Sequence, residues 1–275
     1  MPVLGDKSDR LRVGAVSFLN TKPLVYRLAA SAPQIELVFD VPSRLADDLA
    51  VGRLDAALIP SIELLRDPGY AIVSDACIGC RGPVLSVKLL GRRPLAEVRT
   101  LALDESSRTS AVLARILLLQ RYGVRPDIEP FPVGTPVQQC GADAVVLIGD
   151  RAIHPPDAGF VDQWDLGEEW YRWAGLPFVF AMWVAHRGID LARLDAPLRA
   201  ARDAGVANLQ GIARQEAAAV GLTYGQTLTY LRQHLHFFFG SQERRGLQMF
   251  FREAASLGAI PAGAERVLDD CRVAG

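Results

Sequence analysis

The residues best suited to chemistry follow an apolar segment that ends at Leu103. Residues 104–110 form a polar run with three serines, a threonine and an arginine, and leucines recur at helical spacing over residues 111–122. A strand that leads into a helix here would offer free backbone N–H groups, hydroxyl donors and the positive end of a helix dipole. These features suit a carboxylate, so Ser107, Thr109 and Ser110 are candidate anion-binding residues.

The same residues also have a structural explanation. Ser and Thr are the usual N-cap residues, so Ser107 or Thr109 could simply cap the helix. The guanidinium of Arg108 could clamp an anion, or it could point to solvent and pair with Glu105. The sequence leaves these alternatives open, and the backbone N–H groups are the firmer candidates for binding an anion.

Polar residues follow three further expected strands. Asn20 comes just after the first strand, at the edge where open α/β sheets place ligands, and its amide offers donors and an acceptor. It could equally be a turn residue. Ser61 and Gly149 follow two other strand ends and are further candidate substrate-binding residues. Asp150 could act as a base or as the N-cap of the next helix.

Strand and helix patterns alternate along much of the chain. The expected strands cover residues 11–18, 35–41, 56–59, 83–90, 100–103, 127–131, 144–148 and 178–186. Such alternation predicts an α/β fold with a parallel sheet, and the second group of strands predicts a second, small sheet. Helical periodicity from residue 191 onward predicts three helices that close the chain.

Two strands, at residues 84–90 and 178–186, bracket the middle of the chain. We expect them to carry the chain out to a second lobe and back. Residues 11–88 and 187–275 would then form the first lobe, and residues 89–186 the second. Twin crossover strands make a hinge with a ligand cleft between the lobes. Asn20 and the 104–110 run should therefore face each other across one cavity.

Composition excludes several other classes of protein. Of the 275 residues, 50% are apolar and 22% are charged, and 30 Lys and Arg nearly balance 31 Asp and Glu. This is a globular composition without the field of one sign that would attract nucleic acid or an anionic membrane. The first residues lack the pattern of a signal peptide, and no apolar stretch is long enough to span a bilayer. A cytoplasmic location is expected.

The four cysteines, Cys77, Cys80, Cys140 and Cys271, are too few and too irregular for a disulfide scaffold. Cys77 and Cys80 have C-x-x-C spacing, but the Arg-Gly-Pro that follows breaks a helix, so two ordinary thiols in a turn are expected. The sequence offers no compact set of metal ligands, so no metal is expected. Phosphate-loop, dinucleotide-binding and serine-hydrolase motifs are also missing from it.

Six blocks of residues carry a family resemblance. They occupy residues 13–24, 55–61, 82–87, 106–110, 144–150 and 175–183. In this order they resemble the chorismate dehydratase family of the futalosine route to menaquinone. The resemblance implies the two-lobed α/β fold of type II periplasmic binding proteins. It also implies an enzyme that removes water from chorismate, a small dicarboxylate, giving 3-[(1-carboxyvinyl)oxy]benzoate without a cofactor.

The resemblance also implies roles for particular residues. It places Asn20 at the reaction centre. It places Ser86 and the run formed by Ser106, Ser107, Arg108, Thr109 and Ser110 around the substrate. The base stays open, because the substrate's own enolpyruvyl carboxylate could take the proton, with Asp150 as the candidate from the protein.

Two alternatives use the same fold. A non-catalytic solute-binding protein for a small carboxylate would need only the closing cleft, although such proteins are normally exported. The sister enzyme 1,4-dihydroxy-6-naphthoate synthase has an N-terminal motif built around Ser-Pro-Cys-Pro-Asn-Asp, which this sequence does not contain.

Overall fold

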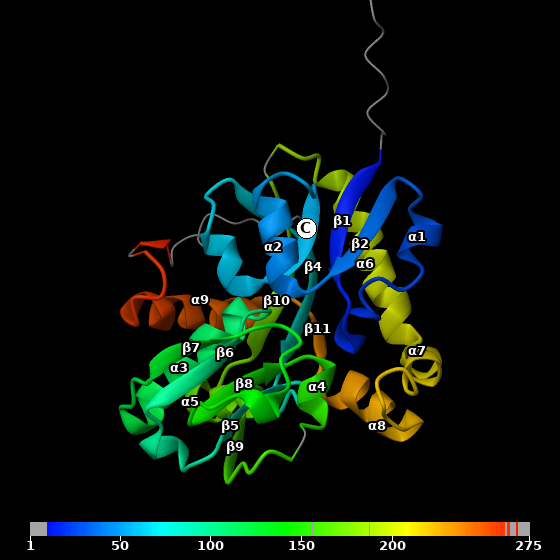
Figure 1. Ribbon diagram of the computed structural model, residues 1–275. Helices are drawn as coiled ribbons and strands as arrows, with labels where there is room; N and C mark the ends of the chain where they lie inside the picture. The colour runs from blue at the N-terminus through cyan, green and yellow to red at the C-terminus, as the bar shows by residue number, and fades with distance from the viewer. Residues whose placement is uncertain (1–9, 156, 187, 262, 265–267, 269–275) are drawn as a thin grey trace, which may run out of the picture.

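The computed structural model contains two β-sheets that lie one above the other in Figure 1. It describes residues 10–155, 157–186, 188–261, 263–264 and 268. The six-stranded sheet has the order β11-β4-β10-β3-β1-β2, and the five-stranded sheet has the order β7-β6-β8-β5-β9. Cys271 and residues 1–9, on which the signal-peptide prediction rests, lie outside the described residues.

The first sheet begins as a parallel βα arrangement, as predicted. β1 (Leu11–Val16) pairs in parallel with β2 (Ile35–Asp40) and β3 (Ala56–Pro60). Between these strands lie α1 (Leu28–Ser31) and α2 (Pro42–Ala50). Proline suits the first turn of α2 because its missing N–H has no helical partner there, and the helix buries Leu45 and Leu49 against the sheet.

The rest of this sheet is antiparallel, so the predicted parallel arrangement holds only for β1, β2 and β3. β10 (Phe178–His186) runs antiparallel to β3 and to the long strand β4 (Tyr70–Cys80), and β11 (His236–Phe238) pairs with the other edge of β4. β4 was not expected. Cys77 and Cys80 are buried in it rather than placed in a turn, and burial raises the pKa of both thiols.

The second sheet is also mixed. β6 (Thr100–Asp104) pairs in parallel with β7 (Asp127–Phe131) and β8 (Ala144–Ile148). β5 (Val87–Gly91) runs antiparallel to β8 and to β9 (Asp162–Asp165). The helices of this part are α3 (Arg108–Tyr122), α4 (Asp150–Ile153) and α5 (Leu166–Ala174).

The chain passes between the sheets along two neighbouring strands, β4 and β10. The return strand covers the predicted residues 178–186. The outward strand is β4 rather than residues 84–90, because β5 belongs to the second sheet. The division into residues 11–88 with 187–275 and residues 89–186 stays a prediction, and the pairing of β10 places that strand with the first sheet.

The C-terminal part contains more elements than predicted. In place of three helices, the described residues form α6 (Ala192–Ala207), α7 (Leu209–Glu216), α8 (Tyr224–Thr229), a π-helical turn (Tyr230–His234), β11 and α9 (Ser241–Ser256). α9 crosses the junction of the two sheets, where it contacts β10 and α3 (Figure 1). No helix among the described residues has the length and hydropathy needed to cross a bilayer.

One continuous apolar core joins the two sheets. At its centre Phe178 packs edge-on against Trp170 of α5 and Phe250 of α9, with ring centroids 5.1 and 5.0 Å away. Phe180 lies 4.6 Å from Phe178 by the same measure. Aromatic pairs of this geometry add stability beyond that expected from their buried area, so these rings help to fix the junction of the two sheets.

Candidate active site

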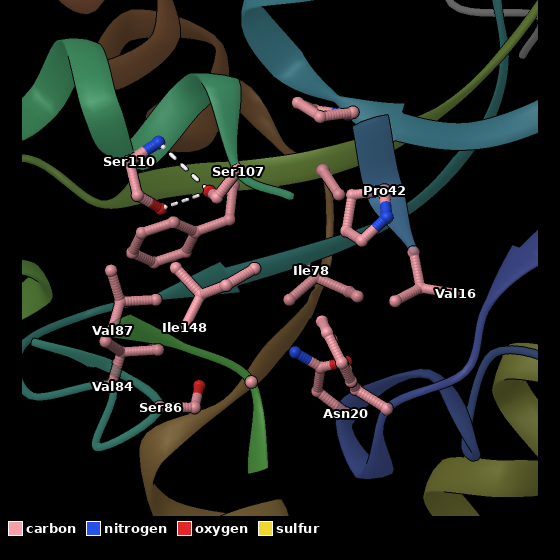
Figure 2. A pocket seen from close by; sticks show the side chains of 15 residues that line it. Val16, Asn20, Pro42, Ile78, Val84, Ser86, Val87, Ser107, Ser110 and Ile148 are labelled. Carbon is pink, nitrogen blue, oxygen red and sulfur yellow. Dashed lines mark hydrogen bonds between the residues drawn. The ribbon is translucent and has the colours of Figure 1, made fainter. Parts of the chain in front are cut away.

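A cavity lies at the junction of the two sheets. Its polar wall consists of Asn20, Ser86, Ser107 and Ser110, and its apolar wall includes Phe18, Ile78 and Phe180. Figure 2 shows Ser107 and Ser110 on one side of the cavity and Asn20 and Ser86 toward another. The asparagine after β1 and the start of α3 therefore do share a single cavity, as expected.

Ser107 both caps α3 and lines the cavity. Its Oγ accepts a hydrogen bond from Ser110 N at 3.4 Å and donates to Ser110 Oγ at 2.8 Å, as the dashed lines in Figure 2 show. The structural explanation is therefore confirmed for Ser107, and its place on the cavity wall leaves an anion-binding role as a prediction. Both serines belong to the start of this helix, so its positive dipole end lies at the cavity.

Asn20 lies in a 3₁₀ turn (Leu19–Thr21) directly after β1. Its Oδ1 accepts a hydrogen bond from Thr21 Oγ1 at 3.3 Å, which orients the amide. The backbone N–H of Leu19 donates to the Asp150 carboxylate at 3.2 and 3.4 Å. Asp150 thus ties the turn that carries Asn20 to α4, which follows the second sheet.

The Asp150 carboxyl is mostly buried at this contact. Burial raises the pKa of Asp150 above its usual value, while the hydrogen bond from Leu19 and the charge of Lys22 act in the opposite direction. Both carboxylate oxygens face a backbone donor, so the group holds the Asn20 turn in place.

Gly149 lines the cavity in a conformation that other residues rarely adopt. Its φ of 68° and ψ of −157° belong to a region that is essentially restricted to glycine. A Cβ added there would lie 2.9 Å from the Phe18 ring. The absence of a side chain lets Phe18 close this side of the cavity.

Ser86 is held by a strained loop between β4 and β5. Leu85 has a φ of 60°, which is uncommon for a residue with a Cβ. The Asp165 carboxylate accepts hydrogen bonds from Val84 N at 2.9 Å and Leu85 N at 2.6 Å, and it also caps α5. Asp165 therefore fixes the loop that directs Ser86 to the cavity.

Three predicted substrate-binding residues are occupied elsewhere. Ser106 Oγ donates to Asp104 at 2.5 Å. Ser61 Oγ donates to the Val179 carbonyl at 2.7 Å, and Thr109 Oγ1 accepts from Ile62 N at 3.2 Å. All three are buried. The contacts of Thr109 with Ser61 and Ile62 join the start of α3 to the segment after β3, whereas the contact of Ser106 stays at the end of β6.

Arg108 points away from the cavity. Its guanidinium lies 2.8 Å from the Asp47 carboxylate and 2.9 Å from that of Glu63. The structure therefore shows neither of the two alternatives left open for Arg108, a clamp on an anion in the cavity or a pair with Glu105. Burial acts to raise the pKa of Asp47, but its hydrogen bonds and charge interactions with Arg108 and Arg66 prevail and lower it. These four side chains form an ion cluster that spans the two sides of the junction.

No charged side chain is among the described residues that line the cavity. Within the same part of the chain, no group of three His, Cys, Asp or Glu side chains is placed to hold a metal ion. An anion in this cavity would meet hydroxyls, an amide and the first turn of α3. Such fixed dipoles act strongly where water is excluded.

The sequence did not predict the apolar side chains that line the cavity, nor the polar residue Tyr230 beside it. Phe18 and Phe180 lie within the resembling blocks, but apolar residues next to strands cannot be told from core residues by pattern. The buried hydroxyl of Tyr230 lies beside Asn20 and Ser86. The sequence did not point to this residue, because it lies in a helical segment that directly follows none of the predicted strands.

The arrangement is that of a periplasmic-binding-protein-like fold with a small-molecule cavity between two lobes. An Archaeoglobus fulgidus protein of known structure is similar, with a TM-score of 0.73, 16% identity and coverage of 93% of this chain and 100% of its own. A Candida albicans protein described as having the generic periplasmic binding protein fold is also similar, with a TM-score of 0.67, 11% identity and 94% of each chain covered.

Sequence comparison gives the family. The chain belongs to the menaquinone biosynthesis family, whose model matches residues 11–256. A Thermus thermophilus protein named chorismate dehydratase is 28% identical over 90% of this chain and 96% of its own length. A Campylobacter jejuni protein of the same name is 32% identical over 61% of this chain and 64% of its own.

Proposed function

We propose that this protein is a chorismate dehydratase, a hydro-lyase that converts chorismate to 3-[(1-carboxyvinyl)oxy]benzoate. One observation carries the proposal: Asn20, Ser86 and the start of α3 face one cavity, and the described residues that line it are uncharged. This arrangement occurs in a chain that belongs to the menaquinone biosynthesis family and is similar to proteins named chorismate dehydratase.

The reaction needs orientation and charge stabilisation more than a strong acid or base. The hydrogen on the ether-bearing ring carbon of chorismate is acidified through the conjugated ring carboxylate. Loss of that proton, followed by loss of hydroxide from the neighbouring carbon, gives an aromatic benzoate and one water. The donors of Ser107, Ser110 and the first turn of α3 would hold a carboxylate whose charge delocalises during this step.

The proton acceptor is assigned to the substrate. Asp150 is the protein candidate, but its carboxylate accepts the Leu19 N–H from outside the cavity wall, which supports a positioning role. The enolpyruvyl group of chorismate is attached through the ether oxygen to the acidic carbon, so its carboxylate lies near the proton that is lost. Asn20 would direct this carboxylate or the leaving hydroxyl through its amide.

Incubating the purified protein with chorismate tests the proposal. We expect an aromatic product that is lighter than chorismate by one water, detected by absorbance and mass spectrometry. A non-catalytic binding protein would bind chorismate and leave it unchanged. That outcome would remove the dehydratase assignment.

A further inference from the structure

Tyr230 has a hydroxyl with no hydrogen-bond partner within the described part of the chain. The residue is only 1% exposed, so bulk solvent does not reach it. A buried polar group without a partner costs free energy, and native proteins contain few of them. Such a group needs an explanation, and a role in binding or catalysis is one of those known.

The surroundings of this hydroxyl connect it to the active site. Burial strongly raises the pKa of Tyr230, while the hydrogen-bonding groups of Ser86 and Asn20 act against that effect. Both side chains therefore lie close to the phenol oxygen, although neither meets the geometry of a hydrogen bond. Since Ser86 and Asn20 line the cavity, Tyr230 approaches the polar wall from behind.

The backbone at Tyr230 is unusual. The residue begins a π-helical turn (Tyr230–His234) that continues α8 and ends just before β11. π-helical turns are rare and are frequent at functional sites. This turn brings a third segment of the chain to the point where the Asn20 turn and the Ser86 loop meet.

The donors and acceptors of the three groups are complementary. Asn20 Oδ1 already accepts the Thr21 hydroxyl, so the amide nitrogen remains as its donor side. The tyrosine hydroxyl can accept one such hydrogen and donate its own to Ser86 Oγ. Ser86 would then turn its hydrogen toward the cavity, and each bond in such a chain polarises the next.

We propose that Tyr230 is a positioning residue of this site, whose hydroxyl links the Asn20 amide to the Ser86 hydroxyl when an anionic ligand occupies the cavity. The link fixes the direction in which both groups donate. The inference rests on the proposed function for the identity of the reaction, but the contact among the three side chains does not depend on it.

Kinetics of Tyr230→Phe test the proposal, with Tyr70→Phe as the matched control. Tyr70 is also 1% exposed, but it lies at the end of β4 remote from the Ser86 loop, where its ring contacts that of His186 at a tilted angle. For Y230F we expect kcat to fall about 10- to 100-fold with KM within about threefold, since misorientation mainly affects the transition state. Y70F should retain the parent kcat. The Tm of Y230F should not fall, because the lost hydroxyl has no partner.

A double-mutant cycle shows whether Tyr230 acts through Asn20. In an Asn20→Ala background, Y230F should lower kcat by less than about threefold, because groups that act as a unit are not additive. A full additional loss in the double variant would overturn the proposal, and so would a parent-like kcat in Y230F. A loss of activity that only follows a lowered Tm would overturn it as well.

A spectroscopic measurement separates this inference from the proposed reaction. The side-chain amide signals of Asn20, assigned in ¹⁵N NMR spectra by their loss in N20A, should shift in benzoate-saturated Y230F relative to the benzoate-saturated parent, and not in Y70F. Unchanged Asn20 signals in Y230F would refute the positioning role, whatever the kinetics. An Asn20 shift in a protein that leaves chorismate unchanged would refute only the proposed function.

Discussion

Asn20 is the residue on which the proposed chemistry depends most. Its amide can donate to and accept from a ligand without adding charge, and it faces a cavity with no cation among its described lining residues. A carboxylate at this position would keep the shape of the side chain and repel a dianion. The account therefore depends on the neutrality of the amide.

The substitution Asn20→Asp tests this dependence. We expect kcat/KM for chorismate to fall about 100-fold or more, comparable to the loss of one donor to a developing charge. The Tm should stay within about 2 °C of the parent, because the residue is only half-buried. Steady-state rates equal to those of the parent would remove Asn20 from the reaction centre.

Gly149 allows a second test at this scale. In Gly149→Ala, the added Cβ would both strain a φ of 68° and press on the Phe18 ring. We expect a loss of about 1–3 kcal/mol in the free energy of unfolding and a smaller cavity with a raised KM. Both are measurable by denaturant titration and steady-state kinetics.

Gly123→Ala is the control for the glycine substitution. Gly123 has the same φ of 68° at the end of α3, with no atom within 4 Å of an added Cβ. It should lose about 1 kcal/mol of stability and keep its KM. If both variants kept the parent KM, Gly149 would have no part in shaping the cavity.

At the scale of elements, the site depends on two carboxylates that hold turns. Asp165 ties the Ser86 loop to the start of α5, and Asp150 ties the Asn20 turn to α4. Neither carboxylate enters the cavity. Both carboxylates act by accepting hydrogen bonds from backbone N–H groups. These bonds connect the ends of neighbouring elements around the site.

Asp150→Asn separates a positioning role from a role as base. The amide oxygen can still accept the Leu19 N–H, so we expect kcat to stay within about threefold of the parent value. A loss of about 100-fold or more would instead support Asp150 as the base. Steady-state kinetics with chorismate distinguish these outcomes.

The same variant should change the pH dependence of stability. Because the pKa of folded Asp150 is raised, the folded state holds a proton that the unfolded state releases above a pH of about 3.8. The stability of the parent relative to D150N should therefore decline as pH rises from there through the raised pKa, and then level off. A difference that grew with pH over this window would contradict the raised pKa.

The sequence predicted the boundaries of helices and strands correctly where a capping residue or a clear apolar pattern marked them. Pro42 and the apolar face of α2 defined that helix, and β7 and β8 cover the predicted residues. β4 was missed because Asp75 and Gly79 interrupt its apolar pattern, and only pairing with β10 and β11 on both sides makes it a strand. The sequence also could not show that Arg108 turns toward Asp47, since its partners are remote in the chain.

At the scale of the whole molecule, the lobes are joined by a shared core and by the ion cluster of Asp47, Glu63, Arg66 and Arg108. Arg108 comes from the start of α3, next to the second sheet, while the other three come from α2 and the turn after β3. A clamp of this kind would favour the arrangement in which Asn20 faces Ser107.

Arg108→Met should weaken this clamp. Because partly exposed ion pairs are worth about 0.2–1 kcal/mol each, we expect KM to rise about three- to tenfold, with kcat nearly unchanged. The KM of the parent should increase with added NaCl and that of the variant should not. Arg172→Met is the control, since Arg172 pairs with Glu168 and Glu169 inside α5. Equal salt dependence in R108M and the parent would argue against a clamp.

The central claim is that one uncharged cavity between the lobes holds the substrate through fixed dipoles. A crystal structure with the aromatic product tests it most directly. We predict one product carboxylate at the first turn of α3, within hydrogen-bond distance of Ser107 or Ser110, and the Asn20 amide in contact with the same molecule. A product molecule bound outside this cavity, or held there by an arginine or lysine side chain, would contradict the account.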